Sequence, residues 1–179
     1  MSATLTTERL VLRPWRETDK VPFAALNNDP RVYATLAGPM SRDDSDAFAD
    51  RIAAHIAEHR WGLWAVEVPG VADFIGFTGL SRPRFEAHFT PCVEIGWRLA
   101  FDHWGRGFAT EAARAVLDFG FGTLKLPEIV SFTTVGNKRS RAVMARLGFT
   151  HDARDDFEHP MLAVDHPLRR HVLYRKRWA

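Results

Sequence analysis

A strand pattern, a glycine-rich turn and a helix pattern follow one another in the segment 93–121, and this order constrains the fold most. Hydrophobic side chains alternate with other residues over 93–99, which predicts a strand with two different faces. A helix is expected over 107–121, and a run rich in β-branched residues over 129–135 predicts the next strand. A strand, a helix and a strand in this order predict one central crossover connection.

The rest of the sequence predicts a mixed α/β (α+β) domain whose sheet is mostly antiparallel. Turn residues at 69–73 separate two strand patterns and favour an antiparallel hairpin. The segment 82–91 holds few apolar residues and two prolines, so a loop is expected there. No repeat or linker is evident, and residues 1–179 are interpreted as a single domain. The other expected strands are 5–13, 63–68, 74–80, 149–156 and 171–177; the other expected helices begin near Asp19 and near Ser41 or span 138–147.

The composition is that of a soluble globular protein, with 46% hydrophobic and 26% charged residues. The sequence has neither an apolar run of about 20 residues nor a secretory signal, and its one cysteine suits a reducing compartment. These features predict a cytoplasmic protein that does not enter a membrane. A net charge of +2 is too small to indicate nucleic acid as a partner, and the basic residues over 169–177 are interpreted as a solvated strand.

The turn before the helix reads Trp104-Gly105-Arg106-Gly107-Phe108-Ala109-Thr110-Glu111-Ala112. Two glycines within three residues let the backbone turn sharply and approach a ligand closely. Successive N–H groups at the start of a helix suit a phosphate. The motif is neither a P-loop nor a dinucleotide fingerprint, because no Gly-Lys-Ser/Thr follows and Thr110 takes the place of the third glycine. By itself the turn could equally be a simple helix start.

A second motif begins at Asn137-Lys138-Arg139-Ser140 and runs to Leu147-Gly148-Phe149. Asn137 is well placed to cap the helix, and that role alone would account for it. Ser140 could likewise be only a hydroxyl in the first helical turn.

Together, the two motifs resemble those of the GNAT superfamily of acetyl-CoA-dependent N-acyltransferases, in particular the branch with the ribosomal-protein alanine N-acetyltransferases. The resemblance covers nearly the whole chain. It starts with Thr7-Glu8-Arg9-Leu10-Val11-Leu12-Arg13-Pro14, continues through Glu94-Ile95-Gly96-Trp97, and is strongest over 104–112 and 137–149. It implies the GNAT fold and acetyl-CoA as the acetyl donor.

The resemblance also implies which residues bind acetyl-CoA. The end of the strand would pair with the pantetheine arm, the glycine turn would hold the pyrophosphate, and the asparagine would contact the arm. Trp104 departs from the general loop pattern but is usual in this branch. The implied residues are Trp97, Arg98 and Leu99 for the strand, Trp104, Gly105, Arg106, Gly107, Phe108, Ala109 and Thr110 for the turn, and Asn137.

Two residues are candidates for catalysis. Glu94 matches a position where some family members place a general-base glutamate; the alternative is a carboxylate on the strand surface or a partner for Arg98. Many members place a tyrosine acid seven residues after the asparagine, but this sequence has Met144 there. The resemblance suggests Ser140 as the substitute, acting as the proton donor or only positioning the sulfur.

The predicted function is therefore the transfer of an acetyl group from acetyl-CoA to an amine, either a protein N-terminus or a small molecule. The alternative is an acyl-CoA-binding sensor or interaction module that lost turnover. No metal is expected, because His55 and His59 lack a third ligand and the zinc-protease spacing. Cys92 fits no nucleophile motif and is interpreted as a buried or edge thiol. The late histidines could line the acceptor side or belong to ordinary loops: His151, His159, His166 and His171.

Overall fold

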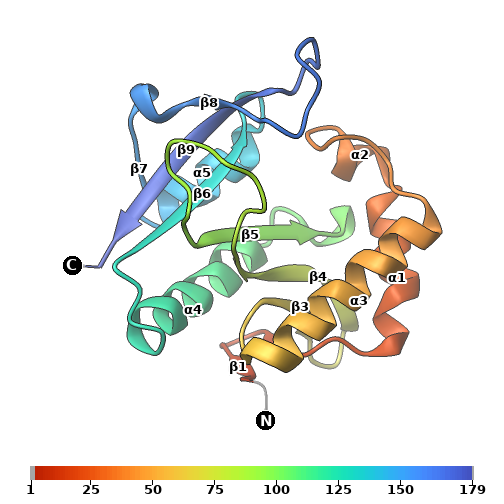
Figure 1. Cartoon of the computed structure of the whole chain (residues 1–179). Coiled ribbons are helices and arrows are strands. Elements are labelled where there is room, and N and C mark those ends of the chain that lie inside the picture. Colours follow the sequence, from red (N-terminus) through yellow and green to blue (C-terminus); the bar gives the residue numbers. More distant parts are fainter. Residues whose placement is uncertain (1–2, 179) are drawn as a thin grey trace.

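The structure is a computed structural model that describes residues 3–178. Within this range, helices lie on both faces of a mixed sheet (Figure 1). The strands are β1 (Leu5–Thr6), β2 (Val11–Arg13), β3 (Leu63–Val68), β4 (Ala72–Ser81), β5 (Glu94–Leu99), β6 (Glu128–Thr134), β7 (Thr150–His151), β8 (Phe157–Glu158) and β9 (Arg170–Arg177). The helices are α1 (Lys20–Asn27), α2 (Pro30–Tyr33), α3 (Arg42–His59), α4 (Phe108–Gly122) and α5 (Lys138–Arg146).

The sheet follows the order β1-β2-β3-β4-β5-β6-β9-β7, and β8 pairs with β9. Among the described strands, β5 and β6 form the one parallel pair, and α4 connects them. The predicted fold class and the predicted crossover are therefore confirmed. The β5–β6 pairing has a register of a single residue pair, Glu94 with Val130, after which the two strands diverge. In Figure 1, β6 and β9 turn away from the plane of β4 and β5.

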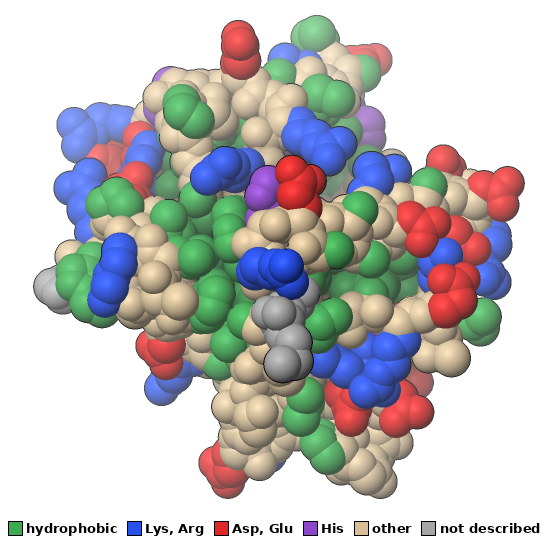
Figure 2. Space-filling model, turned by 60° about the horizontal axis from the view of Figure 1, so that its bottom comes forward, with side chains coloured by type: hydrophobic (Ala, Val, Ile, Leu, Met, Phe, Trp, Pro, Cys, Tyr) green, Lys and Arg blue, Asp and Glu red, His purple; other side chains and the backbone are tan. Residues whose placement is uncertain are grey.

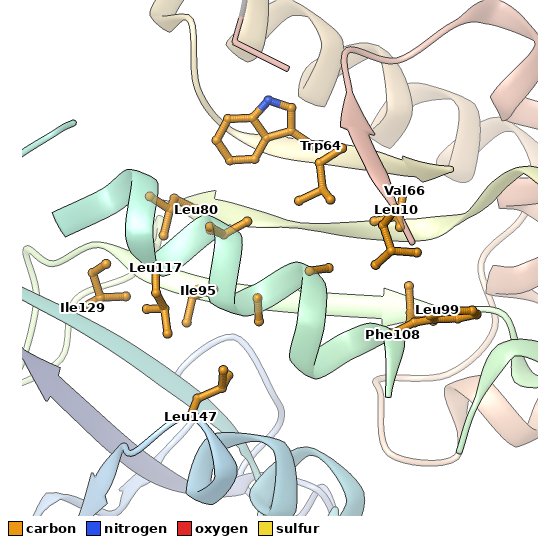
Figure 3. Packing of buried hydrophobic residues seen from close by; sticks show 14 of the residues in the cluster. Leu10, Trp64, Val66, Leu80, Ile95, Leu99, Phe108, Leu117, Ile129 and Leu147 are labelled. Carbon is orange, nitrogen blue, oxygen red and sulfur yellow. The ribbon is translucent and has the colours of Figure 1, made fainter. Parts of the chain in front are cut away.

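The side chains of β4 divide the core between the two faces of the sheet. Phe77 packs with α1, α2 and α3, where it meets Phe23 and Phe48 at ring-centroid distances of 6.0 and 6.1 Å. Leu80 belongs to the larger cluster on the other face, which α4 covers with residues such as Leu117 (Figure 3). The alternation along β4 follows from the two-residue period of a strand. The same period fixes the faces of its neighbour β5.

The N-terminal segment corrects one prediction. The expected single strand over 5–13 is wrong, because a turn divides it into the antiparallel strands β1 and β2. Within that turn, the Thr7 backbone N–H donates to the Leu10 carbonyl at 2.9 Å, and the Thr7 hydroxyl accepts from the Leu10 N–H at 3.0 Å. These local hydrogen bonds satisfy the backbone groups that a continuous strand would have presented to a neighbour.

The C-terminal part corrects another. Only Thr150–His151 of the expected strand 149–156 is extended in the sheet, because a short 3-10 turn over Ala153–Asp155 follows. The short elements α2 and β8 were not predicted. The loop expected over 82–91 is confirmed, but Phe85 and Phe89 anchor it to β6 and β8 through aromatic contacts.

The surface in Figure 2 carries interspersed acidic and basic side chains. The basic residues of β9 are partly neutralised: Arg175 pairs with Glu128 at 2.8 Å and with Asp155 at 2.7 Å, and Arg177 pairs with Glu128 at 2.9 Å. The basic side chains at the end of β9 thus meet acidic partners, but the strand itself is not simply solvated, because it pairs on both sides and residues 171–174 are buried. Within residues 3–178, no helix has the length and apolar character needed to cross a membrane.

Candidate active site

The glycine turn before α4 has the backbone shape that the sequence predicted. Gly105 and Gly107 adopt left-handed conformations with φ of 74° and 82°, which side chains with a Cβ rarely adopt. A Cβ on Gly105 would meet no atom within 4 Å, so this side of the turn is open. The Trp104 indole donates to the Leu99 carbonyl at 2.8 Å and fixes the turn to the end of β5. The exposed backbone of this turn leads directly into the first N–H groups of α4.

The turn is also held from the other end of the chain. The Glu111 carboxylate, in the first turn of α4, accepts from the Thr7 hydroxyl at 2.6 Å and from the Arg9 backbone N–H at 2.9 Å. The Arg9 guanidinium contacts the same carboxylate through Nε at 2.7 Å and Nη2 at 2.6 Å, and its Nη1 donates to the Arg106 carbonyl at 3.1 Å. Burial opposes ionisation of Glu111, but the hydrogen bonds from Thr7 and Arg9 outweigh it and lower its pKa.

This latch of Thr7, Arg9 and Glu111 was not predicted. Its residues belong to the two quoted motifs at 7–14 and 104–112, but nothing local shows that they meet, because 102 residues separate Arg9 from Glu111. The available signal for this contact was that the two motifs carry opposite charges, Arg9 in one and Glu111 in the other.

The far end of β5 has one free edge. Ala100 donates its N–H to the Ile75 carbonyl of β4, so the strand period turns the backbone groups of alternate residues, 95, 97 and 99, away from β4. Two carbonyls on that side already have donors: that of Ile95 accepts from the Ser131 hydroxyl and that of Leu99 from the Trp104 indole. Beyond Glu94, no described strand pairs with β5 on this side, and the backbone of Trp97 is exposed to any added extended chain.

Glu94 lies at the point where β5 and β6 part. Its side chain is half-buried, and within residues 3–178 its carboxylate has no hydrogen bond or ion pair to another side chain. Solvent still reaches it, but the surrounding protein desolvates the carboxylate and raises its pKa from 4.5 to about 8. The suggested pairing with Arg98 is not made. Such a carboxylate is a stronger base when ionised than an exposed one.

Arg98 lies on the same face of β5 as Glu94, and its side chain points under α1 and α3 rather than along the free edge. Its Nη1 donates to the Asn27 side-chain oxygen at 2.6 Å. Its backbone groups face β4, so among the predicted strand residues only Trp97 and Leu99 direct backbone groups to the edge. The Arg98 side chain therefore lies on the side of α1 and α3, away from the free edge.

The second motif forms the start of α5. Asn137 caps this helix as predicted: its side-chain oxygen accepts from the Ser140 N–H at 3.2 Å, and its Nδ2 donates to the Thr133 hydroxyl at 2.9 Å. The Ser140 hydroxyl is half-buried and has no hydrogen bond to another described residue. Met144 is 1% exposed and belongs to the core, so that position supplies no acid.

The two motifs meet in space. The Arg139 guanidinium lies 4.9 Å from the centre of the Trp104 ring, and helices α4 and α5 contact one another. The glycine turn, the start of α5 and the free edge of β5 therefore surround the opening side of the diverging strands. Glu94 and Arg98 lie on the face of β5 opposite to α4, where Arg98 contacts Asn27 of α1 and Phe48 of α3.

The remaining candidates lie elsewhere. Cys92 is partly buried, as the interpretation of a buried or edge thiol expected, and burial raises its pKa to about 11. The rings of His159 and His171 lie 4.9 Å apart at an angle of 49°, His159 also contacts Phe85, and burial lowers the pKa of both imidazoles. His151 stacks on Tyr174. Among residues 3–178, no three metal-ligating side chains cluster.

Comparison with known proteins places the chain among acetyltransferases. Residues 9–150 match the family model of the acetyltransferase (GNAT) domain. The chain is 28% identical over 194 residues to the FsC-acetyl coenzyme A-N(2)-transacetylase of Aspergillus fumigatus, covering 98% of this chain and 77% of that one. It is 25% identical over 179 residues to the [ribosomal protein uS5]-alanine N-acetyltransferase of Escherichia coli, covering 94% and 88%. The crystal structure of an acetyltransferase from Agrobacterium tumefaciens is 30% identical and matches with a TM-score of 0.78 over 99% of this chain and 96% of that one.

An open sheet with two diverging parallel strands and a glycine turn at a helix start is the architecture that this chain shares with the acetyltransferases it matches. More narrowly, the chain belongs to the GNAT acetyltransferase family, as the motifs predicted. Acetyl-CoA is the acetyl donor in this family.

Proposed function

We propose that this protein acetylates a primary amine, either a protein N-terminus or a small molecule, by direct attack of the amine on the thioester. One observation carries the proposal: Glu94 is a desolvated carboxylate without an ion pair, located where the free edge of β5 begins. A general base needs a pKa near the working pH, and about 8 satisfies this condition.

The acetyl-CoA side is formed by the glycine turn and the strand edge. The backbone from Gly105 to Thr110 holds the pyrophosphate, because the left-handed glycines leave its N–H groups uncovered. The pantetheine arm adds to the free edge of β5 at Trp97 and Leu99, and Asn137 at the start of α5 contacts the arm. Trp104 and Arg139 keep the two binding elements in register.

The chemical step needs two proton transfers, one from the attacking amine and one to the departing thiolate. Glu94 takes a proton from the amine, directly or through water, as the new C–N bond forms at the thioester carbon. Collapse of the tetrahedral intermediate breaks the C–S bond. The Ser140 hydroxyl, or water held by it, donates a proton to the departing thiolate. The products are the N-acetylated amine and free coenzyme A.

A thiol-release assay with acetyl-CoA and a broad panel of amines and peptides tests this function. Turnover with any primary amine is the expected result, and the preferred amine identifies the acceptor class. Binding of acetyl-CoA without turnover across the panel would contradict the proposal and favour a non-catalytic acyl-CoA sensor.

A further inference from the structure

The guanidinium of Arg98 is half-buried and only partly satisfied. Its Nη1 donates to the Asn27 oxygen at 2.6 Å and lies 3.8 Å from the Met40 sulfur. The rings of Phe48 and Phe77 lie 5.9 and 5.6 Å from its central carbon. An arginine carries five N–H donors. Within residues 3–178, the Nε and Nη2 groups of Arg98 donate to no protein atom.

No carboxylate compensates this cation in the described part of the chain, and burial alone lowers its pKa to about 10. Arg13 is a buried arginine that does have carboxylate partners: it is 4% exposed and pairs with Asp19 at 2.8 Å and Glu67 at 2.7 Å. A half-buried charge without an anionic partner is poorly solvated, so an external anion at Arg98 would recover part of that desolvation cost.

Arg98 and the proposed base share one face of β5. Glu94, Gly96 and Arg98 alternate with residues that pack under α4, so all three face the side of α1 and α3. Gly96 places no side chain between the two charged groups, and the Glu94 Oε1 atom lies only 3.8 Å from the position of a Cβ there. The α-carbons of Glu94 and Arg98 are about 13 Å apart at the usual strand rise.

We propose that Arg98 binds a carboxylate of the acceptor while the acceptor amine lies at Glu94, so the substrate class is a primary amine that also carries a carboxylate. The inference rests on the proposed function for the role of Glu94. Two sources share this chemistry: a free amino acid and a peptide N-terminus followed by an acidic side chain.

Paired acceptors test the inference. The first pair is a short peptide with Asp or Asn at its second position. The second pair is a free amino acid or its amide, and here kcat/KM is expressed per concentration of neutral amine, because the two α-amines differ in pKa. We expect kcat/KM to favour the carboxylate member of at least one pair by about 10-fold or more, as for a charge-assisted hydrogen bond. The favoured pair identifies the source. Equal kcat/KM within both pairs in the wild-type enzyme would overturn the inference.

Arg98→Met keeps the length of the side chain and removes its charge, so the preference should fall to about 1–2-fold. Arg51→Met is the matched control, because the exposed Arg51 guanidinium lies 5.5 Å from the centre of the same Phe48 ring. This control should keep the preference. A preference that survives Arg98→Met would also overturn the inference. Should Arg98→Met not fold, as judged by thermal unfolding, Arg98→Lys replaces it and should weaken the preference without abolishing it.

Calorimetric binding of the same peptides in the presence of coenzyme A separates this inference from the proposed function. Tighter binding of the Asp peptide that is lost in Arg98→Met supports the anion site even without turnover. Turnover without any difference between Asp and Asn peptides, in rate or in binding, leaves the acetyltransferase function in place and refutes the anion site.

Discussion

Replacing Glu94 by glutamine tests the catalytic proposal most directly, because it removes the charge and keeps the size of the side chain. The carboxyl has a pKa of about 8 in the folded protein, against an ordinary value of 4.5. Two consequences of this shift have opposite signs. The variant should lose activity, and it should gain stability at high pH.

The loss of a general base should lower kcat by roughly 10²–10⁴-fold, with little change in acetyl-CoA binding. With a pKa of about 8, roughly 9% of the Glu94 carboxyl is ionised at pH 7 and roughly 91% at pH 9. The ratio of wild-type to Glu94→Gln kcat/KM should therefore rise about tenfold between these pH values. Ionisation of the acceptor amine cancels in this ratio, because it affects both enzymes equally.

The stability change follows from proton linkage. A carboxyl whose pKa is raised on folding favours the folded state while protonated, and this contribution is lost as the pH rises from 4.5 through about 8. The shift corresponds to at most about 5 kcal/mol, and solvent contact at Glu94 reduces the expected effect to about 2–3 kcal/mol. At pH 9 the variant should thus unfold about 4–12 °C higher than the wild type, while at pH 4.5 the two should be nearly equal.

The assays are thiol release from pH 6.5 to 9 and thermal unfolding at both ends of the range. Glu86→Gln is the control, because Glu86 is an exposed carboxylate in the neighbouring loop 82–91. It should change neither quantity measurably. A loss of kcat below about threefold at neutral pH would show that Glu94 is a strand-surface carboxylate without a catalytic role. A ratio of wild-type to Glu94→Gln kcat/KM that does not change with pH would refute the raised pKa as the cause.

Three further predictions concern the acetyl-CoA site and the acceptor. Gly107→Val should abolish acetyl-CoA binding in calorimetry. The control Gly70→Val changes a glycine with a φ of 74° in the β3–β4 turn, so it should cost similar stability and leave binding unchanged. Unchanged affinity in a folded Gly107→Val variant would refute the assignment of the phosphate loop. Arg9→Ala should raise the KM of acetyl-CoA about tenfold and change kcat by less than threefold, because Glu111 then places an unpaired negative charge beside the pyrophosphate. Adding Glu111→Gln to this variant should restore part of the affinity, and a fall in kcat alone would contradict the prediction. Peptide N-termini should exceed lysine side chains in kcat/KM at pH 7, because about 17% of an α-amine but only about 0.04% of a lysine amine is neutral there; a lysine preference, measured with peptides blocked at one amine or the other, would indicate a stronger base than Glu94.

Several features of this protein are determined by local sequence alone. Paired glycines at 105 and 107 permit the left-handed turn wherever the chain places it, and Asn137 caps its helix through an atom three residues away. Alternation over 93–99 gives β5 its two faces, and Met144 signals a missing acid. The GNAT family was predicted from the resemblance of these short motifs to those of the family, because the motifs lie in local sequence.

Local pattern fails where hydrogen bonds compete over short distances. The N-terminal strand was predicted as continuous, yet the Thr7 hydroxyl and the Leu10 N–H close a turn within it. The anchoring of the loop 82–91 was also missed, because two phenylalanines in a polar segment give no periodic signal until β6 and β8 lie beneath them.

The properties that matter for chemistry were decided by the tertiary structure. The pKa of Glu94 depends on how far folding removes its carboxylate from solvent, which residue type and spacing do not determine. Arg13 and Arg98 are both arginines on strands, but the folded chain brings two carboxylates to Arg13 and none to Arg98. Solvent exclusion and charge pairing are sums over long-range neighbours, so residue type and spacing determine which groups are present, while the fold determines their ionisation and their free donors.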